Sequence, residues 1–278
     1  MKSRAVVVGT TGNAVSTAVV DWAADEARYR RLPLRIVHIL EWDSGQAPES
    51  GSGSYVERVW SAAAAATNAT AARARDIAPG LEITADTLAG HPAGRLLELA
   101  RDAELVVLGH RGSGGFAGLL LGSVSLRVAA HAPCPVAVVR GLPNRDGPIS
   151  AGVDGSPATA QVLETAFAAA AARAARLVVV RAFAPAMQPW PAELKQAEAA
   201  RLEEQLKSER QRFPGVPVEI QLTHRSITSV LVSASVDAQL VIVGSRGRGA
   251  LRAALLGSTG RHVLQHAQCP VLVARPLC

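Results

Sequence analysis

The sequence predicts an α/β protein with two consecutive domains, each built on a five-stranded parallel sheet with helices on both faces. Three observations support this prediction. The chain of 278 residues is longer than one typical domain. Short apolar runs alternate with longer amphipathic segments, which is the pattern of strands joined by crossover helices. The spacing Gly-x2-Gly-x9-Gly-Ser occurs once in each half, over residues 109–123 and 244–258.

In the first half, the apolar run at residues 5–8 ends at Gly9 and is expected to be a strand buried on both faces. A helix follows, because apolar residues recur at helical spacing at Val15, Ala18, Val19, Trp22 and Ala23. The other strands are expected at residues 34–39, 81–87, 104–108 and 135–139. The other helices are expected at 62–78, from 92 onward and at 123–132, with a flexible Gly/Ser/Pro-rich connection at 41–54.

The second half repeats this order. Residues 140–148 contain Gly, Pro, Asn and Asp, a composition typical of linkers. After them, the run at 149–153 matches the first strand, and 177–180 match 34–37 at the same offset. We therefore predict a first domain at residues 1–140, a linker at 141–147 and a second domain at 148–278.

The repeated glycine spacing predicts a binding site for an anion. Glycines allow positive φ angles and a close approach of the backbone to a ligand. A serine that opens a helix leaves free amides at the positive end of the helix dipole. In a parallel sheet the turns after the first and fourth strands are neighbours at the carboxyl edge, so both can contact one ligand. Phosphate is the anion that fits this arrangement.

On this motif, and from end to end of both halves, the chain resembles the universal stress protein family. The resemblance implies two tandem flavodoxin-like (adenine nucleotide alpha hydrolase-like) domains that bind ATP, with Mg²⁺ accompanying the phosphates and no protein side chain as metal ligand. It implies a regulatory, stress-response role through nucleotide-dependent binding. The implied ATP-binding residues of the first domain are Gly9, Thr10, Thr11, Ile39, Gly109, Arg111, Gly112, Ser113, Gly122, Ser123, Val124 and Ser125. Those of the second are Gly152, Val153, Asp154, Ser156, Ala182, Gly244, Arg246, Gly247, Arg248, Gly257, Ser258 and Thr259.

The two halves differ at the turn after the first strand. The second half has Asp154, whose carboxylate is expected to accept hydrogen bonds from the nucleoside and also to shape a turn before the next helix. Thr11 stands at the same position of the first half and carries no charge. The second domain is therefore the better candidate for nucleoside recognition. The strand ends at His38–Ile39 and Arg181–Ala182 are expected to bring main-chain groups beside the base.

Composition restricts the other functions. No run reaches eighteen apolar residues, so a cytoplasmic protein without a membrane segment is expected. The net charge of +6 comes from dispersed arginines without interleaved aromatics, which argues against nucleic acid. Cys134 and Cys269 precede equivalent Pro-Val strands and are expected to be buried. The carboxylates Asp21, Asp25 and Glu26 are expected on a solvated helix face.

Several alternatives remain open at this stage. No P-loop, nucleophile elbow or His-Glu-x2-His motif occurs, so a conventional enzyme is not expected, although a slow ATPase or nucleotide-transforming enzyme stays an alternative. An interaction scaffold without nucleotide is another. His262, His266 and Cys269 have the spacing of a metal site, but Arg127 stands at the position of His262 in the first half, so no pair exists there and no metal site is expected. The last strands, 136–139 and 271–274, are expected to pair the two domains as an internal pseudo-dimer, with a homodimer as a further option.

Overall fold

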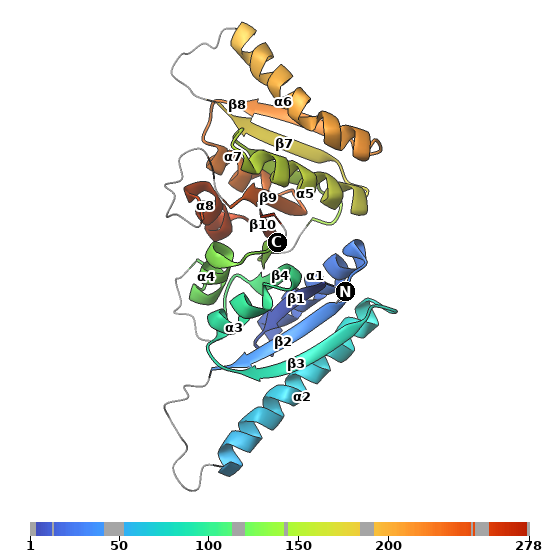
Figure 1. Ribbon diagram of the computed structural model, residues 1–278, viewed down its shortest axis with the longest axis vertical. Coiled ribbons are helices and arrows are strands. Elements are labelled where there is room, and N and C mark those ends of the chain that lie inside the picture. The colour runs from blue at the N-terminus through green and yellow to red at the C-terminus, as the bar shows by residue number, and fades with distance from the viewer. Residues whose placement is uncertain are drawn as a thin grey trace. The chain divides into compact units, whose positions relative to one another are not determined.

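The computed structural model describes residues 4–12, 14–41, 53–112, 120–141, 144–183, 192–245, 247 and 256–276. The chain divides into two compact units, which meet in sequence between Val139 and Arg140. We call them unit 1 and unit 2 (Figure 1). Within the described residues, none of the helices has the length and apolar character needed to cross a membrane.

Unit 1 contains one sheet of parallel strands in the order β3-β2-β1-β4-β5. Its strands are β1 (Ala5–Thr10), β2 (Leu34–Leu40), β3 (Ile83–Ala89), β4 (Ala103–Gly109) and β5 (Val136–Val139). Its helices are α1 (Ala14–Arg30), α2 (Gly53–Ile77), α3 (Pro92–Leu99) and α4 (Ser123–His131). The predicted strands are all present, and the boundaries differ by at most two residues at either end.

Unit 2 repeats the arrangement with the parallel order β8-β7-β6-β9-β10. Its strands are β6 (Ile149–Val153), β7 (Leu177–Ala182), β8 (Val218–Thr223), β9 (Leu240–Gly244) and β10 (Val271–Ala274). Its helices are α5 (Ala158–Ala172), α6 (Ala192–Arg212), α7 (Ile227–Ala234) and α8 (Ser258–His266). The predicted fold class, two α/β domains with parallel sheets, is confirmed.

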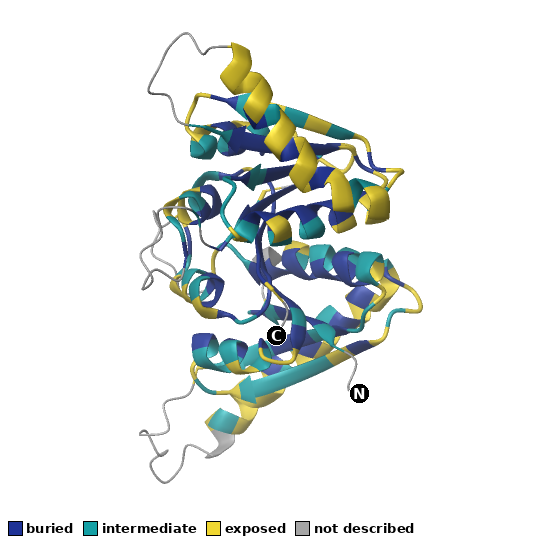
Figure 2. Ribbon diagram, turned by 45° about the horizontal axis from the view of Figure 1, so that its top comes forward, coloured by how far each residue is buried: buried dark blue, intermediate teal, exposed yellow. Residues whose placement is uncertain are grey.

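The helices cover both faces of each sheet. In unit 1, α1 and α2 pack together on one face, and α3 and α4 pack together on the other. In unit 2, α5 and α6 form the first layer, and α7 and α8 form the second. Central strands are therefore buried along almost their whole length, whereas the residues of β3 and β8 are mostly half-buried or exposed (Figure 2). Burial on both faces explains why the central strands are continuous runs of valine, isoleucine and leucine.

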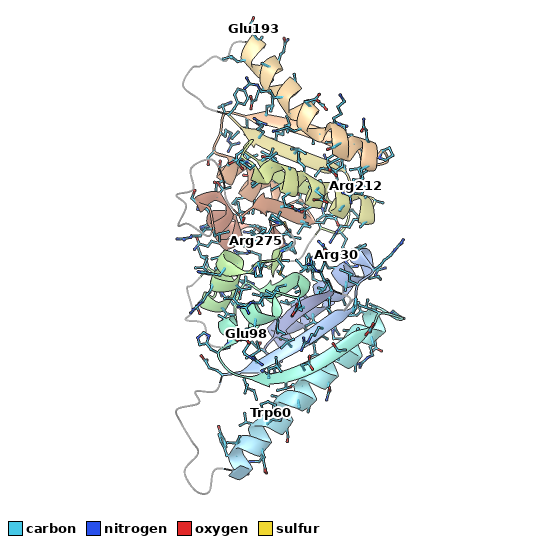
Figure 3. All side chains as sticks on the ribbon, viewed as in Figure 1. Arg30, Trp60, Glu98, Glu193, Arg212 and Arg275 are labelled. Atoms are coloured by element: carbon cyan, nitrogen blue, oxygen red, sulfur yellow. The ribbon has the colours of Figure 1, made fainter. Side chains whose placement is uncertain are left out.

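Helix α2 begins earlier than the sequence indicated. The predicted start was Ala62, but the helix starts at Gly53. Its first turns are largely exposed, and Trp60, labelled in Figure 3, is 41% exposed. The Gly/Ser/Pro-rich composition of residues 41–54 favoured a loop and placed the predicted helix start too late.

One expected solvated carboxylate is instead buried. Glu26 is 1% exposed, and its Oε1 lies 2.6 Å from Nε of Arg30, one helical turn later (Figure 3 labels Arg30). Asp21, by contrast, pairs at the surface with Arg73 of α2, at 2.7 Å. The prediction was wrong for Glu26 because an ion pair allows a carboxylate to enter an apolar layer.

The cysteine prediction is confirmed. Cys134 and Cys269 are buried and unbridged. Burial raises the pKa of the Cys269 thiol to about 12, so it stays protonated at neutral pH. Both side chains therefore act as small apolar groups.

The segment expected as a linker packs against unit 2 where it is described. The amide of Gly147 donates to Asn144 O at 2.9 Å, and Gln239 Nε2 donates to Gly147 O at 2.7 Å. A Cβ on Gly147 would collide with the carbonyl oxygen of Asp237, and one on Gly141 with that of Gln268. Small residues here therefore allow close backbone contact and do more than lend flexibility.

Candidate functional site

The parallel register brings most of the predicted site residues to one edge of each sheet. In unit 1, Thr10 at the end of β1 pairs with His38 of β2, so Ile39 lies one residue further along the same edge. On the other side, Val8 pairs with Val107, which places Gly109 of β4 close to the end of β1. In unit 2 the corresponding pairs are Val153 with Arg181 and Gly152 with Val243, and Ala182 and Gly244 follow them.

The Gly-Ser pair of each motif opens a helix. Gly122 and Gly257 precede α4 and α8 in extended conformations and, as glycines, supply no side-chain cap. The motif loop is closed in the same way in both units, since Gly122 N donates to His110 O and Gly257 N to Ser245 O, each at 2.8 Å. The first turns offer backbone amides to an anion. They comprise Ser123, Val124 and Ser125 in unit 1, and Ser258, Thr259 and Gly260 in unit 2.

One predicted ligand residue has a structural contact. The hydroxyl of Ser125 donates to the carbonyl oxygen of Gly109 at 2.7 Å and so ties the start of α4 to the end of β4. Unit 2 has Gly260 at this position, and a Cβ there would lie 3.6 Å from Gly244 O. The hydroxyl tie is thus particular to unit 1.

In unit 2, the turn after β6 lies against the glycine motif. Ser156 N donates to Asp154 Oδ1 at 2.9 Å, which closes a tight turn. The other carboxylate oxygen, Oδ2, lies 2.6 Å from the point that a Cβ of Gly247 would occupy. Gly247 therefore leaves room for the carboxylate, and two segments 93 residues apart in the sequence meet at one point.

The equivalent turn of unit 1 is built from hydroxyls. Thr10 Oγ1 accepts a hydrogen bond from Gly12 N at 3.1 Å and donates to Ser16 Oγ at 3.0 Å. The strand registers give Thr11 the position of Asp154, as the sequence offset predicted. No carboxylate stands at that position in unit 1.

The glycines that end β1 and β6 have a packing role. A Cβ on Gly9 would lie 2.8 Å from Leu108 Cδ2, and one on Gly152 would lie 2.6 Å from Leu231 Cδ1. The space that their side chains would fill is therefore occupied by the hydrophobic core. Only their backbone groups remain available to a ligand.

The strand-end residues of β2 and β7 also differ in chemistry. His38 is half-buried beside Gly12, and burial lowers the pKa of its imidazole, against a smaller opposite effect of a hydrogen bond to the backbone of Ala63. Arg181 is 3% exposed, forms an ion pair with Glu198 of α6, and donates to Gln205 Oε1 at 2.9 Å. Both side chains face the helix layer. At these strand ends, main-chain groups are therefore the candidates for contact with a ligand.

Two glycines of the strand-one turns were absent from the predicted site. Gly12 and Gly155 have φ angles of 71° and 72°, a left-handed conformation that favours glycine. Gly12 directly follows Thr11, and Gly155 directly follows Asp154, the position at which the two units differ. The signal in the sequence was the Asp-Gly pair, which is typical of a tight turn.

Some predicted residues cannot be placed. Ser113, Arg246 and Arg248 lie outside the described residues. Arg111 and Gly112 are exposed just beyond β4, and a Cβ on Gly112 would meet nothing within 4 Å. Gly112 therefore differs from its counterpart Gly247, which adjoins a carboxylate.

Comparison with known proteins agrees with this repeated architecture. Residues 2–140 and 147–275 each match the model of the universal stress protein family. The chain is 34% identical to Universal stress protein Rv2005c of Mycobacterium tuberculosis over 291 residues, covering 99% of this chain and 98% of the relative. It is 32% identical to Universal stress protein Rv2623 of the same organism over 304 residues, covering 98% and 97%.

A solved structure shows the same fold over the full length. The crystal structure of a universal stress protein from Archaeoglobus fulgidus DSM 4304 superposes with a TM-score of 0.74 at 19% identity and covers 99% of both chains. The two matches to the family model and the full-length relatives lead to one conclusion, which confirms the resemblance seen in the glycine motif. The chain belongs to the universal stress protein family.

Proposed function

We propose that the protein binds ATP at the carboxyl edges of its two sheets and acts as a nucleotide-dependent regulator, with unit 2 as the stronger site. The observation that carries this proposal is the convergence of Asp154, Gly247 and the start of α8. A carboxylate, a side-chain-free loop and a row of helix amides meet there. Such a set can hold a polar nucleoside and a polyphosphate side by side.

The phosphates are assigned to the glycine motif. Gly257 precedes α8 in an extended conformation, and the helix start supplies amide donors together with the positive end of the dipole. In unit 1, Gly122 and α4 supply the same groups. Because these donors belong to the backbone, the cradle depends on small residues at the glycines more than on any charged side chain.

The nucleoside is assigned to the strand-one turn and the end of the second strand. Asp154 Oδ1 accepts a hydrogen bond from the Ser156 amide, and Oδ2 faces Gly247. An ionised carboxylate oxygen has more than one acceptor direction, so Asp154 can accept from ribose hydroxyls while it keeps the turn closed. Thr11 of unit 1 lacks this capacity, which makes unit 1 the weaker nucleoside site.

Mg²⁺ would enter the same site together with the phosphates of the nucleotide. Among the described residues, no cluster of three or more His, Cys, Asp or Glu could hold a metal ion. Mg²⁺ commonly keeps several waters and binds mainly through phosphates, with one or two carboxylates. Phosphate oxygens and water would hold the ion, and no protein side chain is assigned as its ligand.

The test is a measurement of ATP stoichiometry and affinity by calorimetry on the full chain. Gly247→Glu puts bulk and negative charge into the cradle of unit 2, and Gly112→Glu does the same in unit 1. The parent should bind two ATP molecules with different affinities. Gly247→Glu should remove the tighter site and leave the weaker one, and Gly112→Glu should do the reverse. Full retention of both sites in Gly247→Glu would refute the assignment.

A second measurement separates nucleoside from phosphate recognition. Asp154→Ala should reduce the affinity for ATP more than the affinity for inorganic triphosphate. Thr11→Ala is the matched control in unit 1 and should change neither by much. Equal losses for ATP and triphosphate in Asp154→Ala would count against a nucleoside role. Mass analysis of the nucleotide released from denatured protein would identify the base directly and distinguish a binding protein from a scaffold without nucleotide.

A further inference from the structure

A pair of histidines lies on α8 outside the proposed nucleotide site. His262 and His266 are one helical turn apart, so they project from the same face. Their ring centroids are 4.2 Å apart, with 31° between the ring planes. Contact between the two imidazoles brings four ring nitrogens into a small region of the surface.

Both rings are accessible to solvent, to different extents. His262 is exposed and His266 is half-buried. In the part of the chain that the structure describes, the two imidazole rings contact each other. The comparable residue of α4 in unit 1, His131, instead holds its Nδ1 2.8 Å from the carbonyl oxygen of Arg127. Arg127 occupies the position of His262, so unit 1 has no such pair.

We propose that His262 and His266 form a binding site for a late divalent transition metal, with water completing the coordination sphere. Two histidines four residues apart on one helix can bind a single metal ion, as in zinc enzymes with this spacing. Imidazole suits copper, nickel and zinc, and it does not suit magnesium, which prefers oxygen ligands. The expected order of affinity is Cu²⁺ above Ni²⁺ above Co²⁺ and Mn²⁺.

The site uses two protein ligands. Cys269 follows three residues after His266, but it is 1% exposed and its thiol has a pKa of about 12. A metal would need the thiolate, which burial disfavours. The absence of a larger His, Cys, Asp or Glu cluster among the described residues agrees with a two-ligand site.

The electrostatic setting has two opposing parts. His266 lies in the last turn of α8, where the helix dipole favours a cation. Two arginines oppose it. Arg261 is exposed beside His262, and the guanidinium of Arg140 donates to the carbonyl oxygens of Leu264 and Gln265. The chelate of two imidazoles therefore supplies the binding energy, and net local charge does not.

The metal site and the phosphate site lie at different points of the same helix. Ser258 opens α8, and the histidines follow four and eight residues later, roughly 6 Å and 12 Å along the axis at the usual rise. A metal bridging His262 and His266 would staple one turn of α8 without occupying the helix start. Metal binding at the histidine pair and ATP binding at the helix start can therefore be measured independently.

The first experiment titrates the full chain with Ni²⁺ alone, in calorimetry near neutral pH. His262→Ala and His266→Ala should each weaken one Ni²⁺ site by about tenfold or more, because loss of a direct ligand exceeds the effect of losing a supporting contact. His262→Arg, which gives α8 the residue found in unit 1, should do the same. His131→Ala is the matched control and should leave that site unchanged. Equal Ni²⁺ affinity in the parent and both alanine variants would overturn the proposal.

The second experiment transfers the pair to unit 1. Arg127→His places an imidazole one turn before His131, and this variant should bind one more Ni²⁺ ion than the parent. Mg²⁺ should produce no heat with either protein at the histidine pair. A variant that folds and gains no Ni²⁺ would contradict the inference that this helical pair is sufficient. Arg127 is exposed, so the circular dichroism spectrum of Arg127→His should match that of the parent.

Discussion

Oδ2 of Asp154 lies 2.6 Å from the position that a Cβ of Gly247 would occupy. Real Cβ atoms are not found so close to an oxygen, so any side chain at Gly247 must displace the carboxylate. The flexible end of Asp154 can move, and the fold can therefore survive the change. The arrangement of Asp154 relative to the cradle cannot survive it.

Gly247→Ala is expected to weaken ATP binding in unit 2 by about tenfold, or about 1.4 kcal/mol, with a smaller loss of folding stability. The displaced carboxylate would lose its hydrogen bond from Ser156, which contributes about 0.5–1.5 kcal/mol. Calorimetry and urea unfolding measure the two effects. The loss should shrink when Asp154→Ala is already present, because the two residues are in contact. Fully additive effects would contradict the contact.

Gly152→Ala is expected to destabilise unit 2 by about 1–3 kcal/mol, because the new Cβ would lie 2.6 Å from Leu231 Cδ1 in a packed core. Gly94→Ala in α3 is the control of opposite sign. Nothing lies within 4 Å of its Cβ position, so it should stabilise its helix by about 0.5–1 kcal/mol. Urea unfolding monitored by circular dichroism distinguishes the two. A neutral Gly152→Ala would show that Leu231 can move aside.

His38 is expected to make unit 1 less stable in acid. Burial lowers the pKa of its imidazole in the folded state, so below its ordinary value of 6.5 the unfolded chain binds more protons. Stability should therefore fall as the pH drops through 6.5 toward the folded pKa. His38→Gln should flatten this part of the pH dependence of the free energy of unfolding. An unchanged slope in His38→Gln would exclude His38 as the source.

Arg181→Leu is expected to destabilise unit 2 by about 3–5 kcal/mol, because it leaves Glu198 charged in a site from which solvent is largely excluded. Glu198 retains a longer contact with Arg201, at 3.5 Å. The double variant Arg181→Leu with Glu198→Leu should recover much of the loss. Chemical unfolding of the two single variants and the double variant forms the cycle. A double variant as unstable as the sum of both singles would argue against the pairing.

Ser125→Ala is expected to cost about 0.5–1.5 kcal/mol and to loosen the cradle of unit 1, since the hydroxyl holds the carbonyl of Gly109 at 2.7 Å. Ser123→Ala, at an exposed first helical position, is the control. Hydrogen exchange of the amides at the start of α4 reports the local change. Equal exchange in both variants would mean that the Ser125 hydroxyl does not hold the helix start in place.

Much of this molecule could be predicted from periodicity and repetition. Strands such as β5 and β6 are short apolar runs bounded by turn residues, so their limits follow from the residues themselves. The repeated glycine spacing located the loop and helix start in both units, because glycine and serine at those positions report a local backbone requirement. The sequence also predicted that Thr11 and Asp154 occupy equivalent positions, and the strand registers of the two units agree with this.

Tertiary structure alone decided what depends on neighbours distant in sequence. It buried Glu26, which pairs with Arg30 of its own helix, gave Gly9 and Gly152 a role in core packing, and set Gly247 against Asp154. It also excluded Cys269 from the histidine pair by burying it. Local sequence fixes hydrogen bonds within an element and the side of a strand that a residue occupies. Which side chain meets which is fixed only when helices and strands pack, because that contact depends on distances that no short stretch of sequence contains.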